Sequence, residues 1–201
     1  MVNEQDIERL KLSCSTDLEA SRILTDIIIE LKDLRKKYLY NPLTKVRNRT
    51  AFEEVETYKA VVQCDVDNFK QVNDKYGHEV GDEVLKFIAR VLVHFFRGED
   101  LVVHRSGDEF TIILNKCSLA NAKIKLMKAN EQLGDESSKI ADGLHISLSY
   151  GISEYHDKKE FYKALDEADK ALYASKNSGK GKVTIYSEIE VDKLGNQLVK
   201  R

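Results

Sequence analysis

Proline, cysteine and tryptophan are scarce in this sequence: 201 residues contain one proline, three cysteines and no tryptophan. Cys14, Cys64 and Cys117 are scattered and match no metal-binding spacing, so we expect reduced thiols in a cytoplasmic protein. There is no signal peptide and no apolar run of roughly eighteen residues, so the sequence predicts no membrane association. The formal net charge of −2 gives no electrostatic case for binding a nucleic acid polymer.

The sequence contains enough hydrophobic residues to form a core. Hydrophobic residues make up 42% of the chain, and 33% of the residues are charged, which favours a soluble surface. This length suits one domain of about 150 residues with an extension. We predict an amino-terminal helix at 1–40, a globular domain at 41–187 and a polar tail of unassigned role at 188–201.

The amino-terminal segment has the spacing of a coiled coil. Apolar residues recur at alternating steps of three and four, in the order Leu24, Ile27, Leu31, Leu34 and Tyr38. The seam weakens earlier, because Asp17 and Ser21 stand where apolar residues would be needed. Two or three heptads are marginal for self-association. The segment therefore predicts either a dimerisation helix or an amphipathic helix packed on its own domain.

Beyond Asn41-Pro42, which breaks the first helix, strand and helix patterns alternate. Strands are predicted at 60–66, 101–103, 110–114, 144–151 and 182–186. Helices are predicted at 49–58, 68–76, 80–96, 119–133 and 161–175. This order favours an α+β fold with a mixed central sheet covered by helices.

Two acidic stretches stand at the ends of predicted strands. Asp65 and Asp67 end one strand, and Asp108 and Glu109 follow the turn Ser106-Gly107 of a β-hairpin. If the two strands are neighbours, the four carboxylates meet at one edge of the sheet and repel one another unless a cation lies between them. Oxygen ligands favour Mg²⁺ or Mn²⁺, the ions of phosphoryl transfer.

Five motifs in order resemble those of the GGDEF-type diguanylate cyclases, bacterial enzymes that condense two GTP into cyclic di-GMP. They lie at residues 41–49, 65–74, 77–82, 106–110 and 168–180, where 106–110 reads Ser-Gly-Asp-Glu-Phe. The resemblance covers roughly residues 41–186. It implies a ferredoxin-like, palm-type nucleotidyl cyclase domain, here preceded by a long helix.

The resemblance also implies which residues bind metal and act in catalysis. Asp65, Asp108 and the carbonyl group of Val66 would bind two ions, Mg²⁺ or Mn²⁺, in each active site. Glu109 would orient a ligand or take the proton from the 3′-hydroxyl group, and these alternatives stay open. Lys70 would neutralise phosphate charge.

Further matching positions imply contacts with the substrate and the product. Asn73 and Asp82 resemble the guanine-reading residues, with His78 nearby, and Lys176 and Lys180 resemble the phosphate-binding lysines. The signature turn Ser106-Gly107 would lie against the substrate. Arg97 and Asp100 match the family's inhibitory R-x-x-D site, which binds cyclic di-GMP as a brake.

Several of these residues have an ordinary structural alternative. Asp82 could cap a helix, and Lys176 and Lys180 could be placed by the helix dipole alone. Arg97 and Asp100 could form a charged loop after a helix.

Two departures from the family pattern bear on activity. Ser106 replaces the first glycine of the signature, and His104 stands where many relatives carry arginine. A serine with a positive φ at this turn would cost about 1 kcal/mol, and its Cβ would intrude on the phosphate. Since the metal acids and guanine readers are kept, we expect reduced rather than absent activity.

The sequence therefore predicts a diguanylate cyclase that works as a homodimer, because one site holding one GTP cannot close the ring alone. Two alternatives remain. A catalytically weak or inactive domain could bind GTP or cyclic di-GMP as a receptor, or a related palm-type enzyme could make a mixed or linear dinucleotide.

Overall fold

The amino-terminal helix and the globular domain are separate units. The computed structural model describes residues 18–55, 59–96, 98–115, 117–191 and 197–199. Contacts divide the chain into Met1–Tyr40 and Asn41–Arg201.

Helix α2, Leu18–Leu39, forms the described part of the first unit. The expected helix over 1–39 is thus present for 22 residues, and positions 1–17 lie outside the described residues. Much of its apolar side-chain surface is exposed: Ile23, Ile27, Ile29, Leu31, Leu34 and Tyr38. Among the described helices, none is long and apolar enough to span a membrane.

The second unit is built on a mixed five-stranded sheet of order β2-β3-β1-β4-β5. The strands are β1 Ala60–Val66, β2 Leu101–Ser106, β3 Glu109–Leu114, β4 Leu148–Glu154 and β5 Val183–Ile185. Neighbouring strands pair antiparallel except β4 and β5, which are parallel. The predicted α+β class with a mixed central sheet is confirmed.

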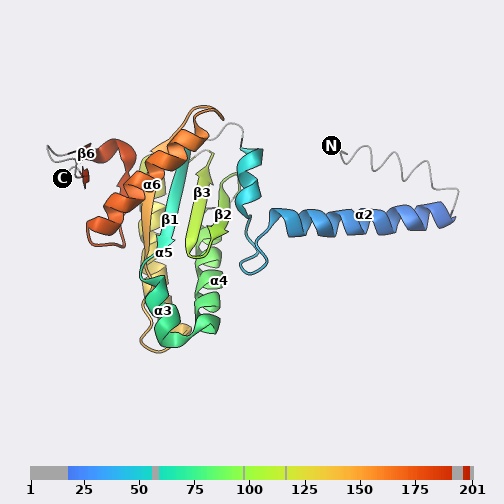
Figure 1. The fold of residues 1–201 in the computed structure, drawn as a ribbon, viewed down its shortest axis with the longest axis horizontal. Coiled ribbons are helices and arrows are strands. Elements are labelled where there is room, and N and C mark those ends of the chain that lie inside the picture. The colour runs from blue at the N-terminus through green and yellow to red at the C-terminus, as the bar shows by residue number, and fades with distance from the viewer. Residues whose placement is uncertain (1–17, 56–58, 97, 116, 192–196, 200–201) are drawn as a thin grey trace. The chain divides into compact units, whose positions relative to one another are not determined.

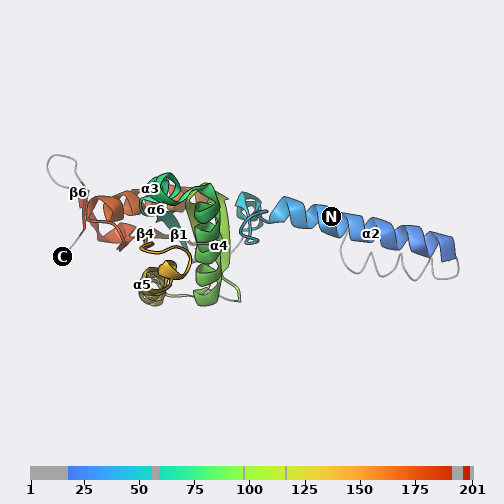
Figure 2. The ribbon, with the colours of Figure 1, turned by 90° about the horizontal axis from the view of Figure 1, so that it is seen from below.

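Helices cover both faces of this sheet, as Figures 1 and 2 show. The helices are α3 Phe69–Tyr76, α4 His78–Phe95, α5 Leu119–Glu136 and α6 Phe161–Asn177. Side chains alternate along β1, so Val62 and Cys64 join the core with α4 and α5, while Val61 joins the core with α6. The two cores hold the sheet between α6 and the α4–α5 pair.

Gly151 allows α6 to lie directly on β4. A Cβ atom at this position would lie 2.0 Å from the carbonyl oxygen of Ala168 and 2.2 Å from the backbone nitrogen of Leu172. Only glycine fits against backbone at that separation. Helix α6 is therefore held close to the centre of the sheet.

Several boundaries differ from the sequence prediction by a few residues, and three differences have a structural consequence. Strand β4 begins at Leu148 rather than residue 144, and the carbonyl of Leu144 accepts a hydrogen bond from Ser137 Oγ rather than from a neighbouring strand. The predicted helix over 49–58 is a 3-10 helix, Arg49–Glu54, capped by Asn48. The hairpin turn is Gly107-Asp108, not Ser106-Gly107.

The carboxy-terminal residues add a short 3-10 helix, Tyr186–Glu188, and a small hairpin. Strand β6, Ile189–Val191, pairs antiparallel with β7, Gln197–Val199. Residues 192–196, in the predicted polar tail, lie outside the described residues.

Candidate active site

The pairing of β1 with β3 brings the two acidic stretches together. Asp65 and Glu109 are register partners in the antiparallel ladder, and Val66 N donates a hydrogen bond to the carbonyl of Asp108 at 3.2 Å. The condition set by the sequence, that these strands are neighbours, is met. Asp65 and Asp108 therefore share one end of the sheet.

Asp65 is a largely buried acid with a cationic partner. Its side chain is 15% exposed, and Oδ2 lies 2.7 Å from Lys176 Nζ on α6. Burial raises the pKa of Asp65, Lys176 lowers it, and the negative charges of Asp108 and Asp67 raise it again. A partly desolvated carboxylate with like charges nearby favours a bound cation.

The donors at this end suit a hard divalent ion. Asp65 and Asp108 offer carboxylate oxygens, and Val66 offers a backbone carbonyl. No group of three or more His, Cys, Asp and Glu side chains gathers as a metal site in the described part of the chain. This is compatible with Mg²⁺, which commonly takes one or two carboxylates and completes its shell with water and substrate phosphates.

Asp67 does not join this cluster, which corrects the expectation that four carboxylates meet. Its side chain is only 7% exposed and accepts hydrogen bonds from Ser149 Oγ at 2.7 Å, Ser147 Oγ at 2.6 Å and Gly181 N at 2.9 Å. A carboxylate with both oxygens so engaged has little capacity left for a cation.

The signature turn avoids the strain expected at Ser106. Gly107 takes the positive φ of 53°, while Ser106 ends β2 opposite Glu109 after a register shift that follows His104. Ser106 Oγ donates to Glu109 Oε2 at 3.2 Å. The serine thus fits the hairpin because the turn lies one residue later than the sequence indicated.

His104, which the sequence marked only as a departure from the family pattern, supports this turn through a hydrogen bond to its backbone. The ring is buried, stacks on Phe110 at 4.5 Å, and places Nε2 2.9 Å from the carbonyl of Gly107. Because a carbonyl can only accept, Nε2 carries the proton, and Nδ1 accepts from Thr44 Oγ1 at 3.1 Å. Burial lowers the pKa of His104, so the neutral ring is favoured.

Glu109 belongs to a polar network that sequence reasoning missed. Arg105 lies 3.9 Å from Glu109 Oε2 and 3.9 Å from Asp169 Oδ1, which also accepts from Gln63 Nε2 at 2.9 Å. Gln63 in turn accepts from Thr111 Oγ1. Gln63 and Asp65 are two residues apart on β1 and so share one face of the strand. This spacing was the signal in the sequence that Gln63 could belong to the site. The network connects the signature to α6.

Two further lysines lie near the start of α3. Lys180 Nζ donates to Asn68 Oδ1 at 2.6 Å, and Asn68, with φ of 59°, gives α3 no side-chain cap. Lys70 is exposed on the first turn of the same helix. The positive end of the helix dipole, Lys180 and Lys176 thus form a cationic region beside Asp65.

The predicted guanine readers come from the α3–α4 pair. Asn73 is partly buried on α3, whereas His78 and Asp82 are exposed on the first turns of α4. A Cβ at Gly81 would lie 2.0 Å from Asn73 Oδ1, so glycine is required for the asparagine to occupy this position. Asn73 and Asp82 are thus carried by helices in direct contact.

The comparisons with known proteins identify this architecture. A family model described as diguanylate cyclase, GGDEF domain, matches residues 38–182. The chain belongs to this family. Diguanylate cyclase A of Treponema denticola is 34% identical over 166 residues, which are 80% of this chain and 44% of that protein. The chain spans 44% or less of the length of the first curated relatives.

Solved GGDEF structures share the fold. The coiled coil and GGDEF domain of DgcB from Caulobacter crescentus, in complex with c-di-GMP, aligns over 87% of this chain and 99% of that chain, with a TM-score of 0.75 at 24% identity. The GGDEF domain of the same protein with c-di-GMP covers 74% of this chain and 96% of that chain, with a TM-score of 0.67 at 26% identity.

Of the predicted inhibitory pair, Arg97 and Asp100, the structure of this GGDEF domain describes only Asp100. Arg97 lies outside the described residues. Asp100 Oδ1 accepts from Asn115 N at 3.0 Å, and Oδ2 lies 4.0 Å from Lys125 Nζ. The aspartate therefore has an intramolecular role at the end of β3.

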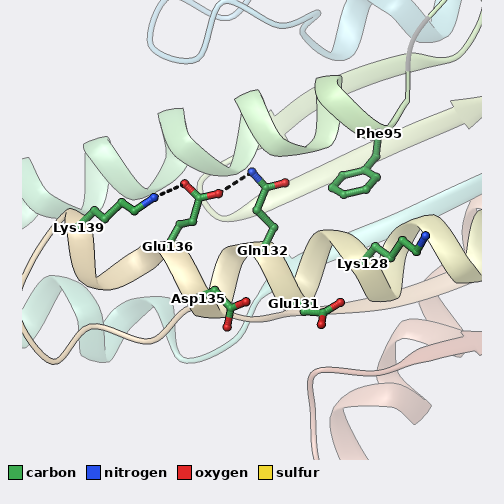
Figure 3. Close-up of a pocket in the computed structure, with 7 residues that line it drawn as sticks. All are labelled: Phe95, Lys128, Glu131, Gln132, Asp135, Glu136 and Lys139. Atoms are coloured by element: carbon green, nitrogen blue, oxygen red, sulfur yellow. Dashed lines mark hydrogen bonds and ion pairs between the residues drawn. The ribbon is translucent and has the colours of Figure 1, made fainter.

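A groove of about 460 Å³ lies between α4 and α5, and none of the proposed site residues lines it. Figure 3 shows Glu136 accepting hydrogen bonds from Gln132 on α5 and from Lys139 just after this helix, with Phe95 of α4 at one end of the group. Its lining is mostly charged: Lys128, Glu131, Asp135, Glu136 and Lys139, with Gln132 and Phe95.

Proposed function

We propose that this chain is a diguanylate cyclase that condenses two GTP into cyclic di-GMP and two pyrophosphates. The observation that carries the proposal is the convergence of Asp65, Asp108 and Lys176 beside the uncapped start of α3. Acids and cations at one sheet edge suit a triphosphate with its metal ions.

Asp65, Asp108 and the Val66 carbonyl would hold the metal, Mg²⁺ or Mn²⁺, with two ions per site. When bound, such ions lower the pKa of the attacking 3′-hydroxyl group and stabilise charge on the leaving pyrophosphate. Glu109 would orient a ligand or accept the proton of that hydroxyl, and its contacts with Arg105 and Ser106 beside the signature turn support this role.

The triphosphate would lie over the first turn of α3. Lys176 and Lys180 would neutralise its charge from the α6 side, and Lys70 from α3 itself. The first amide groups of the helix would add hydrogen bonds to the phosphate oxygens.

Asp82 would accept hydrogen bonds from N1–H and the 2-amino group of guanine, with Asn73 as a second contact and His78 at the rim. Adenine lacks these donors and would leave the acid unpaired, which discriminates by about 10⁴-fold in sites of this kind. Incorporation of adenine in a reaction with mixed GTP and ATP would contradict this role.

Ring closure requires two subunits, each bringing one GTP, so the active form would be a homodimer working in the cytoplasm, where GTP is supplied. The exposed apolar residues of α2 support a helix that pairs with its copy. A chain that remains monomeric at high concentration while producing cyclic di-GMP would refute this.

Arg97 and Asp100 would bind the product and slow the enzyme. Arg97→Ala should raise the cyclic di-GMP concentration needed for half-inhibition. If cyclic di-GMP inhibits this variant as strongly as the wild type, the proposal that Arg97 binds the inhibitory product is wrong.

The deciding experiment incubates the purified chain with GTP and Mg²⁺ and identifies the product by mass. We expect cyclic di-GMP from the wild type and none without metal. Tight GTP binding without any cyclic product would instead indicate a receptor.

A further inference from the structure

Asp67 is the acid of the Asp65–Asp67 pair that the proposed chemistry leaves unused, yet it is the better partnered of the two. It accepts hydrogen bonds from Ser149 Oγ on Oδ1 and from Ser147 Oγ and Gly181 N on Oδ2, at 2.6–2.9 Å. A buried carboxylate with this many donors is held firmly, and its donors are held in return.

One of these donors, Gly181 N–H, ends a loop with unusual backbone geometry. Gly179, Lys180 and Gly181 have φ angles of 113°, 62° and 60°. A lysine in the left-handed region costs about 1 kcal/mol and persists only where its surroundings enforce it. Here Asp67 binds the amide of Gly181, and Asn130 Nδ2 donates to its carbonyl at 3.2 Å.

The result of this conformation is the position of the Lys180 ammonium group. Nζ lies 2.6 Å from Asn68 Oδ1, at the residue that precedes α3 and follows Asp67 directly. The backbone amide of Asp67 also donates a hydrogen bond to the Ser147 carbonyl at 2.9 Å, so both the main chain and the side chain of Asp67 are held in place. Asp67 therefore joins the start of α3 to the loop that carries Lys180.

We propose that Asp67 is a positioning residue: through Gly181 it holds Lys180 against the start of α3, where the triphosphate binds, and it does not ligate metal. This inference rests on the proposed function for the identity of the nucleotide. The same carboxylate in a metal site would instead face Asp65 and leave the serines unbonded.

The test is a double-mutant cycle of Asp67→Asn and Lys180→Met, read by the Kd of a non-hydrolysable GTP analogue with Mg²⁺ and by kcat and KM for GTP. Asparagine keeps the shape but turns an amide donor toward groups that already donate. Each single variant should weaken analogue binding about tenfold. The double variant should bind no more weakly than Lys180→Met, because both changes remove the same contact.

Ser147→Ala is the milder second variant if Asp67→Asn does not fold, because Ser147 Oγ donates to Asp67 Oδ2, whereas Ser149 Oγ also accepts directly from Gly181 N at 3.2 Å. It removes one donor to Asp67 and should weaken analogue binding about threefold, an effect that disappears in the Lys180→Met background. Asp142→Asn, on an exposed loop, is the matched control and should bind as the wild type does.

Additive losses in the cycle, a raised Mg²⁺ requirement in Asp67→Asn, or unchanged analogue binding in Ser147→Ala would each overturn the inference. Its failure is separable from failure of the proposed function. A wild type that forms no cyclic di-GMP refutes the cyclase activity, while the analogue-binding cycle still decides what Asp67 does.

Discussion

Lys176 Nζ lies 2.7 Å from Asp65 Oδ2, so the last turn of α6 supplies a cation to the acid at the end of β1. The two residues are 111 positions apart in the sequence but belong to adjoining elements, and burial alone would raise the pKa of Asp65. Their contact joins the proposed metal ligand to the proposed phosphate ligand in one cluster.

Replacing Lys176 with Met should therefore weaken GTP binding. A charged hydrogen bond to phosphate typically contributes about 1.5–3 kcal/mol, so KM for GTP should rise by about tenfold or more. Lys170→Met on the same helix is the control, because Lys170 pairs with Asp166 at the surface. Steady-state kinetics on both variants decides the matter: equal KM values would show that Lys176 serves only to balance Asp65.

Asp108→Ala should remove activity without unfolding the domain. The fold uses the backbone carbonyl of Asp108, which accepts from Val66 N and survives the substitution. The lost side chain also repels Asp65, so the free energy of unfolding should stay within about 0.5 kcal/mol of the wild type. Loss of a metal ligand should lower kcat by about 10³-fold or more, as measured by product formation. Retained turnover would rule out Asp108 as a metal ligand.

Gly151→Ala should damage the fold itself. The new methyl group would meet the backbone of α6 at 2.0 Å, and backbone cannot move aside as a side chain can. We expect a loss of about 3 kcal/mol or more in the free energy of unfolding, measured with urea. Gly134→Ala is the contrasting variant, since its methyl group would meet only the exposed His145 ring. Helix α5 should then gain from alanine, by up to about 1 kcal/mol. Similar losses in both variants would contradict this account.

These contacts also show what the sequence could and could not predict. The strand flanks of Asp65 and Glu109 are strongly apolar, so the two strands were predictable from pattern alone, whereas their adjacency entered only as a condition that the pairing of β1 with β3 meets. The roles of Asp67 and Gly151 were not, because each depends on partners more than 15 residues away: Gly181 and Ser149 for the acid, and α6 for the glycine.

The signature turn was misplaced for a similar reason. Ser106-Gly107 is a good turn pair by local preference, but the register shift after His104 moves the turn to Gly107-Asp108. That shift accompanies the His104 bond to the Gly107 carbonyl, a contact supported by Thr44 from 60 positions away. Local sequence preferences contain no information about such a contact.

The buried His104 gives the stability of the domain a specific pH dependence. Burial lowers its pKa, so the unfolded chain takes up a proton more readily than the folded one. The contribution of the neutral ring is therefore fully present above the unfolded pKa of about 6.5 and is lost as the pH falls below it. Urea unfolding at several pH values between 7.5 and 5 measures the summed slope of all titrating groups, and comparison with a variant that lacks the imidazole isolates the part due to His104.

His104→Phe is the matched variant, because it keeps a ring to stack on Phe110 but cannot titrate. At pH 7.5 it should be less stable by about 1–2 kcal/mol, since Thr44 and the Gly107 carbonyl lose a buried partner. Burial raises the pKa of Asp65 and Asp169, which opposes the histidine as the pH falls, but both acids are present in the two proteins. The gap in stability between wild type and variant should therefore narrow as the pH falls below about 6.5. A gap that stays constant down to pH 5 would show that His104 does not titrate with folding.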